Sequence, residues 1–250
     1  MTKKEYYQLE LNQADDWTAY LIEHSNLPGP RANLELMEAF VELGSEKDFI
    51  PLLDHTPVLA PENSPEEFLA FCGTVGLGEL IANGMKEYLP DLRKQASDPR
   101  WRIREAVAKA LHIIGLYDFS LLASTCKDWM DGNLLEQRAV AAGICEPSLL
   151  AEQDHAHFAL ELLDHISQSF LKAEDRKNEG FVALCKGLSY CWSIGIEANP
   201  EKGKPPFEKL ARSDDPDLLR ITRENLKKKR LIKMDPDWVA RLMSDLKSTE

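Results

Sequence analysis

The sequence predicts an all-α protein, an α-solenoid of stacked antiparallel helix pairs, because its apolar residues recur with helical spacing. In Ala159, Leu162, Leu163, Ile166 and Phe170, the steps of 3, 1, 3 and 4 place the side chains on one face of a helix. Strict alternation of apolar and polar residues is absent over any useful length, and β-branched residues are sparse. Proline, glycine and asparagine divide the chain into segments of helix length.

Proline-rich breaks divide the first half of the chain. Residues 26–30, Asn-Leu-Pro-Gly-Pro, precede a helix that opens near Asn33, a residue type that caps helix N-termini. A long irregular connection with four prolines between residues 51 and 65 ends in Ser-Pro-Glu-Glu, which combines an N-cap, a proline at the first helical position and acids in the first turn. The predicted helices in this half are residues 4–12, 15–25, 33–43, 46–54, 65–83 and 86–96.

The second half is divided by Asp-Pro and Glu-Pro steps at residues 98, 146, 215 and 235. The predicted helices are residues 99–115, 119–130, 133–145, 154–173, 177–198, 205–212, 216–231 and 236–247. The helix 177–198 has little polar surface, which predicts an interior position. Gly203, Pro205 and Pro206 predict that residues 199–214 form a loop that contains only the short helix 205–212.

Length and composition fit one helical-repeat domain over residues 1–250, with 44% hydrophobic and 29% charged residues. The most apolar segment, residues 181–196, is interrupted by Lys186 and is shorter than the roughly 20 residues of a membrane span. No membrane contact is therefore expected. The start of the chain has no apolar run typical of a secretory signal. Five scattered cysteines without a Cys-x-x-Cys pair indicate buried free thiols and a cytoplasmic location.

The charge is unevenly distributed. The formal net charge is −12, which argues against a nucleic-acid-binding protein. Between Lys202 and Lys233, however, 11 Lys or Arg face 5 Asp or Glu, a net charge of +6, so the rest of the chain carries −18. The sequence therefore describes an acidic protein with one basic end.

Three segments share a pattern. Residues 98–106 read Asp-Pro-x-x-x-Ile-Arg-x-Ala, residues 215–226 repeat the Asp-Pro start, and residues 133–142 keep the arginine and the small residues. This pattern resembles the second helix of a HEAT repeat, and second-helix starts about 34 to 44 residues apart are compatible with that family. The resemblance is clearest over residues 86–232, whereas residues 1–64 are less regular.

The resemblance implies roles for the aspartate, the arginine and the alanines of the pattern. In HEAT repeats an aspartate caps the second helix, an arginine bonds back across the repeat junction, and alanines allow the next pair to pack closely. We therefore expect Arg104 to be largely buried and bonded to a loop carbonyl or carboxylate, with Asp98 as its partner.

A second resemblance is to the HEAT-like DNA alkylation-repair glycosylases. Trp101, with Arg100, Arg102 and Arg104 around it, is similar to the aromatic and basic residues with which that family holds a duplex. The acidic N-terminal two-thirds does not continue a basic groove, and no aspartate matches the family's catalytic motif. DNA-binding glycosylase-like activity is therefore the alternative interpretation.

The basic end supplies the other candidate binding residues. Arg220, Arg223, Lys227 and Arg230 are spaced 3, 4 and 3 on the predicted helix 216–231, so they should form one stripe. Together with Trp101 and Arg102 they form the candidate anion- or partner-binding residues. A solvated helix face explains the stripe equally well.

Two further motifs favour structural over chemical roles. Metal-ligand spacing occurs in two pairs, His157 with Glu161 and Glu152 with His155, but no second Glu-x-x-His helix accompanies them, so a solvated face and no metal site are expected. Gly73, Gly76 and Gly78 lack the strand and the lysine of a phosphate-binding loop, and we expect them to let neighbouring elements approach closely. No cofactor site or catalytic residue is predicted.

The sequence thus favours a non-enzymatic interaction scaffold whose partner is another protein. Binding of nucleic acid is disfavoured by the net charge, and the glycosylase-like protein remains the alternative.

Overall fold

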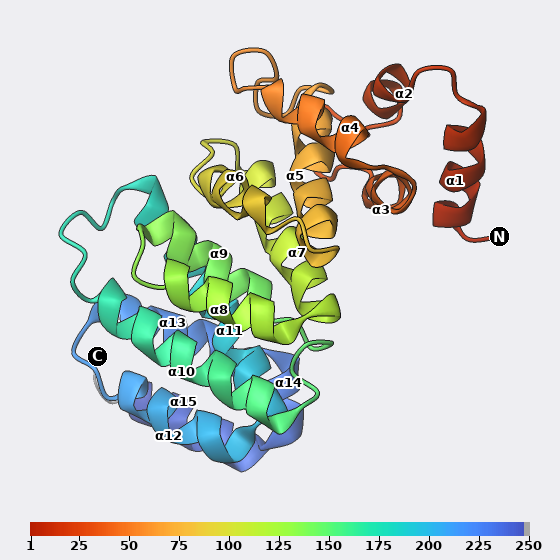
Figure 1. The fold of residues 1–250 in the computed structure, drawn as a ribbon. Helices are drawn as coiled ribbons and strands as arrows, with labels where there is room; N and C mark the ends of the chain where they lie inside the picture. Colours follow the sequence, from red (N-terminus) through yellow and green to blue (C-terminus); the bar gives the residue numbers. More distant parts are fainter. Residues whose placement is uncertain (248–250) are drawn as a thin grey trace. The chain divides into compact units, whose positions relative to one another are not determined.

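A computed structural model describes residues 1–247 of the chain (Figure 1). About 73% of these residues are helical and none is in a strand, which confirms the all-α prediction. The described chain contains 15 α-helices and two short 3₁₀ helices. It divides into two compact units, Met1–Ile114 and Gly115–Glu250, and each is described by itself.

The first unit contains short helices arranged around one long apolar helix. Its elements are α1 (Lys3–Gln13), α2 (Trp17–Glu23), α3 (Leu34–Leu43), α4 (Glu46–Phe49), η1 (Ile50–Asp54), α5 (Glu67–Ala82), η2 (Lys86–Tyr88), α6 (Leu89–Gln95) and most of α7 (Trp101–Tyr117). Helix α5 is buried along nearly its whole length and contacts α2, α3, α4 and α6. It is therefore the core of this unit.

Glycines on α5 allow this dense packing, as predicted. A Cβ atom at Gly78 would lie 2.6 Å from the Cα of Ala110 on α7. At Gly73 it would lie 2.9 Å from the carbonyl oxygen of Phe49, and at Gly76 it would overlap the Phe49 ring. Only a residue without a side chain fits at these positions.

The second unit has a long buried helix at its centre. Its elements are α8 (Phe119–Trp129), α9 (Leu134–Ile144), α10 (Gln153–Phe170), α11 (Glu179–Ala198), α12 (Pro200–Ala211), α13 (Pro216–Leu226), α14 (Lys229–Met234) and α15 (Pro236–Lys247). Helix α11 packs against α9, α10, α12, α13 and α14. Its apolar side chains, among them Phe181, Leu188 and Trp192, are buried, which confirms the interior position predicted for this helix.

The prediction for residues 199–214 was wrong. Instead of a loop with a short helix, Pro200–Ala211 forms the continuous helix α12. Asn199 caps it by accepting a hydrogen bond from the Lys202 amide, and Pro200 occupies the first helical position. Pro205 and Pro206 leave two first-turn carbonyls without helical donors, but these belong to exposed residues whose carbonyls can bond to solvent.

The prediction of one continuous helix over residues 216–231 was also wrong. Helix α13 ends at Leu226, and the backbone of Lys228 is extended, with φ −71° and ψ 130°. A new helix, α14, begins at Lys229. This change of direction buries Leu231 while Lys229 and Lys233 stay exposed. Two predicted helices are each divided in the structure: residues 46–54 form α4 and η1, and residues 86–96 form η2 and α6. The other predicted helices agree with the structure to within a few residues at their ends.

Candidate functional site: a cleft and an anchored loop beside helix α7

Three arginines at the start of α7 are buried: Arg100, Arg102 and Arg104 are 3%, 4% and 6% exposed. A buried guanidinium needs hydrogen-bond acceptors, because an unpaired charge in the interior is costly. All three find these acceptors within the first unit.

Arg104 bonds back to the turn before its own helix. Its Nη1 donates to the carbonyl oxygens of Asp98 and Pro99, at 2.7 and 2.8 Å. This confirms that Arg104 is buried and bonded to loop carbonyls, with Asp98 as one partner. The Asp98 carboxylate itself pairs with Arg100, at 2.7 Å.

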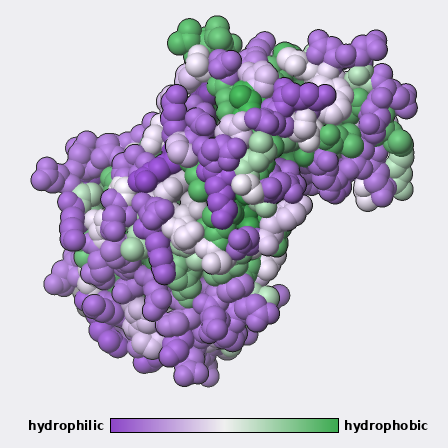
Figure 2. All heavy atoms as spheres, in the orientation of Figure 1, coloured by the Kyte–Doolittle hydropathy of each residue, from purple (hydrophilic) through white to green (hydrophobic). Residues whose placement is uncertain are grey.

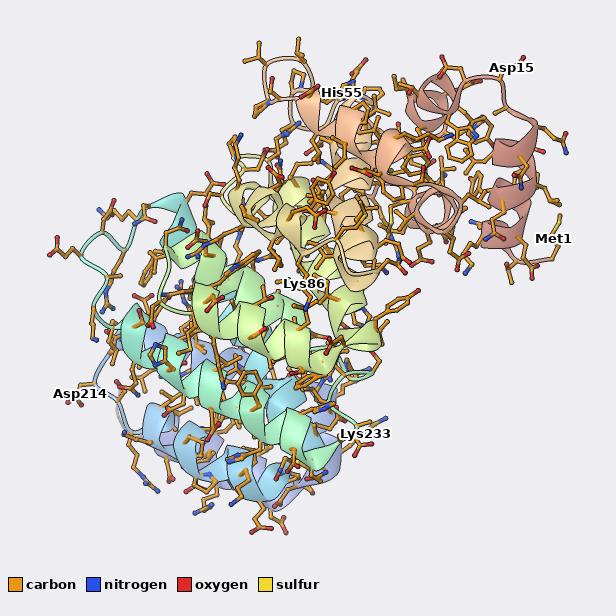
Figure 3. All side chains as sticks on the ribbon, in the orientation of Figure 1. Met1, Asp15, His55, Lys86, Asp214 and Lys233 are labelled. Atoms are coloured by element: carbon orange, nitrogen blue, oxygen red, sulfur yellow. The ribbon has the colours of Figure 1, made fainter. Side chains whose placement is uncertain are left out.

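Arg100 anchors the loop of residues 55–66, which we call the anchored loop. The Asp98 carboxylate accepts from both Nε (2.9 Å) and Nη2 (2.7 Å) of Arg100. The remaining guanidinium nitrogen, Nη1, donates to the carbonyl oxygens of His55 and Ala60, at 2.8 and 2.9 Å. One buried guanidinium thus holds the loop at two points five residues apart (Figure 3 labels His55).

Arg102 anchors the same loop further along. Its Nη1 lies 3.1 Å from Oε2 of Glu67, which is fully buried, and its Nη2 donates to the carbonyl of Gly29 at 2.5 Å and to Oδ1 of Asn63 at 3.1 Å. The Asn63 amide donates to the Glu67 carboxylate at 2.7 Å. Asn63 has φ +67°, a left-handed conformation that asparagine tolerates.

This buried network is not fully satisfied. Within residues 1–247, Oε1 of Glu67 and Nε of Arg102 have no hydrogen-bond partner. Burial raises the pKa of the Glu67 carboxyl above its usual value, against the lowering effects of the Asn63 amide and of Arg102. The carboxylate nevertheless balances the charge of Arg102, so the network presents no net positive charge.

A cleft of about 510 Å³ opens over this network. It is lined by residues 28–30, Glu62, Asn63, Trp101 and Arg102. Trp101 is 41% exposed, and the Arg102 guanidinium carbon lies 4.4 Å from the centre of its ring. Of the two candidate residues that sequence analysis placed here, Trp101 therefore reaches solvent, whereas Arg102 forms the buried floor of the cleft.

The outer part of the anchored loop is apolar and unprotected. Val58 is 87% exposed and Leu59 is 66% exposed, although the carbonyls before and after them are fixed by Arg100. Figure 2 shows hydrophobic atoms at the end of the loop that Figure 1 draws in orange between α4 and α5. Sequence analysis missed this feature because the arginines that anchor the loop lie about 40 residues away along the chain.

The four basic candidate residues of the second unit do not form one stripe, because α13 and α14 are separate helices. Arg220 pairs with Asp217 at 2.9 Å, and Lys227 pairs with Glu224 at 2.6 Å. Arg223 donates to the carbonyl of Leu246 at 3.2 Å. Most of this basic charge is therefore balanced locally.

Arg230, the fourth, lies on α14 beside an aromatic ring that sequence analysis did not single out. It pairs with Glu197 at 3.0 Å and donates to the Tyr190 hydroxyl at 3.0 Å. Lys228 also lies over the Tyr190 ring, at 5.4 Å from its centre. Tyr190 is 46% exposed, which its place in the apolar segment of α11 did not indicate.

The histidines of α10 have local partners. Nε2 of His157 lies 3.5 Å from Glu161, and His165 lies 2.7 Å from Asp131. In residues 1–247, no group of three His, Cys, Asp or Glu side chains is placed to hold a metal ion. No described helix is long and apolar enough to cross a membrane.

Comparison with known proteins found no relative: no family model, no curated protein and no solved structure matches the chain.

Proposed function

We propose that the protein is a non-enzymatic scaffold of stacked helix pairs, similar to HEAT repeats, which binds a protein partner through the anchored loop. The proposed location is the cytoplasm. All five cysteines are buried free thiols, as expected in a reducing compartment.

Helix contacts within the second unit support the stacked arrangement. Helices α9, α11 and α13, each the second member of a pair, pack side by side, and each contacts the helix that precedes it. Helices α8, α10 and α12 contact one another in the same order. Such an arrangement buries the face that a single pair would leave exposed.

The anchored loop is the observation that carries the proposal. Exposed aliphatic side chains on a mobile loop can turn inward, but the loop here is fixed from beneath by Arg100 and Arg102. Val58 and Leu59 are thus presented in a fixed position. Burying one such side chain in a partner is worth about 1.5–3 kcal/mol, and a rigid loop loses little conformational entropy on binding.

Burial of the arginines beside Trp101 favours protein binding over the DNA-binding alternative. Arg100, Arg102 and Arg104 donate to carbonyls and carboxylates of the first unit and expose almost no surface. Phosphate groups need exposed basic side chains. Within this cluster, Trp101 offers a stacking surface of the kind that the alternative requires.

Replacing the exposed pair of the anchored loop should abolish partner binding. Immobilised wild-type protein would be compared with V58D/L59D for the proteins retained from a lysate of the source cells, quantified by mass spectrometry. We expect at least one specifically retained protein to fall by about tenfold or more, because apolar anchors at the centre of an interface dominate its affinity.

The matched control is V182D/I232D, which places two aspartates at exposed aliphatic positions of the second unit. It should retain the partner. An equal loss of the retained partner in both double variants would contradict the proposed binding surface. So would the absence of any retained protein that depends on Val58 and Leu59.

A further inference from the structure

The first unit is strongly acidic. Residues 1–114 contain 11 Lys or Arg and 19 Asp or Glu, a net charge of −8, whereas residues 115–250 contain 19 and 23, a net charge of −4. Three of the 11 cations in the first unit are the buried arginines of α7. Two acids, Glu67 and Asp98, are buried with these arginines, so the surface of the unit stays strongly negative and attracts a positively charged partner.

The cleft beside Trp101 combines this negative charge with an aromatic surface. Arg102 covers part of the Trp101 ring, but the residue stays 41% exposed, so ring surface faces the solvent. Glu62 lines the same cleft, and within residues 1–247 its carboxylate has no ion-pair partner. An aromatic ring next to a free carboxylate is a suitable environment for a cationic side chain.

The charge of Arg102 does not oppose such a ligand, because the Glu67 carboxylate 3.1 Å away neutralises it. The Arg102 guanidinium also holds the wall of the cleft in place through Gly29 and Asn63. The cleft is thus formed before the ligand arrives. A volume of about 510 Å³ accommodates one long side chain with its flanking backbone.

We infer that the Trp101 cleft binds a lysine or arginine side chain from a basic segment of the protein partner. The cation lies on the exposed part of the Trp101 ring and forms an ion pair with Glu62. This inference rests on the proposed function: the anchored loop supplies apolar contacts, and the cleft, whose wall includes Glu62 and Asn63 of the same loop, selects a basic sequence.

The experiment uses a fluorescein-labelled peptide of alternating glycine and arginine, eight residues long, and measures its binding to the full-length protein by fluorescence anisotropy at low salt. A citrulline peptide of the same length, which is neutral, serves as the reference ligand. We expect the arginine peptide to bind and to shift the indole N–H resonance of Trp101, whereas the citrulline peptide binds more weakly by about tenfold or more.

Two variants and two matched controls test the site. E62Q and W101L should each lower the affinity for the arginine peptide by roughly threefold to tenfold, because each removes one contact to the cation. E87Q removes the same charge from an exposed position of the same unit outside the cleft, and Y6L removes an equally exposed aromatic ring. Both controls should change the affinity by less than about twofold. If W101L does not fold, the loss of peptide affinity in E62Q alone tests the proposed site.

Two results would overturn the inference: no binding of the arginine peptide to the wild-type protein, or equal losses in all four variants, which would indicate unspecific attraction to an acidic surface. In either case, partner retention that still depends on Val58 and Leu59 would leave the scaffold function intact. If neither the arginine peptide binds nor any retained partner depends on Val58 and Leu59, both proposals are refuted.

Discussion

Arg104 supplies a donor to two backbone carbonyls, one of which belongs to the buried Asp98. Its side chain is 6% exposed and bonds to the carbonyls of Asp98 and Pro99. Arg104→Ala should lower the free energy of unfolding by about 2–4 kcal/mol, because the carbonyl of the buried Asp98 loses its donor and the packing of the buried Arg104 side chain is lost. Urea denaturation followed by circular dichroism measures this loss.

The control is Arg212→Ala, at a side chain that is 72% exposed and pairs with Glu208 one turn earlier on α12. Exposed pairs of this kind contribute little, so the control should change stability by less than about 1 kcal/mol. Similar effects of the two substitutions would show that Arg104 has no special structural role.

The residues of the cleft show how far the sequence alone can lead. The Asp-Pro pattern predicts the role of Arg104 because its acceptors lie five and six residues away. The burial of Arg102 depends on Glu67 and Gly29, which lie 35 and 73 residues away. One signal for it was available: Arg102 precedes the buried Ala106 and Ala110 by one and two helical turns, so it belongs to the packed face of α7.

At the scale of elements, the approach of α5 to α7 depends on Gly78. A side chain there would collide with the backbone of Ala110, at 2.6 Å from its Cα and 2.8 Å from its carbonyl oxygen. Gly78→Ala should therefore destabilise the first unit by roughly 1–3 kcal/mol, as overpacking does, although alanine is the better helix former. Thermal unfolding measures the change.

Gly187 on α11 is the matched control, since it is also a glycine within a helix. A Cβ atom there would meet only the Cγ of Arg138, at an ordinary contact distance of 3.6 Å. Gly187→Ala should raise stability by up to about 1 kcal/mol. A stabilising effect at both positions would mean that α5 and α7 can separate at little cost.

Element boundaries were predictable where local chemistry sets them and unpredictable where packing does. Asn33, Asp118 and Asn133 cap helices close to their predicted starts because the cap acts within one turn. The break after Leu226 has no proline or glycine to signal it. There Asn225 is buried and bonds to the carbonyl of Leu188 and the amide of Ser193, contacts that depend on α11.

At the scale of the whole molecule, the charge distribution decides whether the basic end is an anion-binding surface or a solvated helix face. Of the cations between Lys202 and Lys233, several are paired with nearby carboxylates, among them Lys204 with Asp235 and Arg230 with Glu197. Four lysines of this segment, Lys202, Lys209, Lys229 and Lys233, are exposed, and within residues 1–247 they have no acidic partner. A strong duplex-binding surface needs about six to ten phosphate contacts, which these four lysines cannot provide.

We therefore expect no tight binding of duplex DNA at physiological salt, with a Kd weaker than about 10 µM, in the range of unspecific contacts. The measurement is a titration of a fluorescent duplex, with and without an alkylated base, at roughly 50 and 150 mM salt. Any binding at the lower salt concentration should become weaker as the salt concentration rises. In K229Q/K233Q the slope of log affinity against log salt should shrink by about two units, one for each contact removed.

Lys4, which pairs with Glu42 on α3, provides the control position, because K4Q removes a cation of the first unit and should leave that slope unchanged. Two results would favour the glycosylase-like alternative: lesion-dependent binding that persists at physiological salt, or release of the modified base. Trp101 would then be the residue to replace first, since its exposed ring is the surface on which an unpaired base could stack. Loss of lesion binding in W101L, with peptide binding retained, would assign the cleft to a nucleobase instead of a cationic side chain.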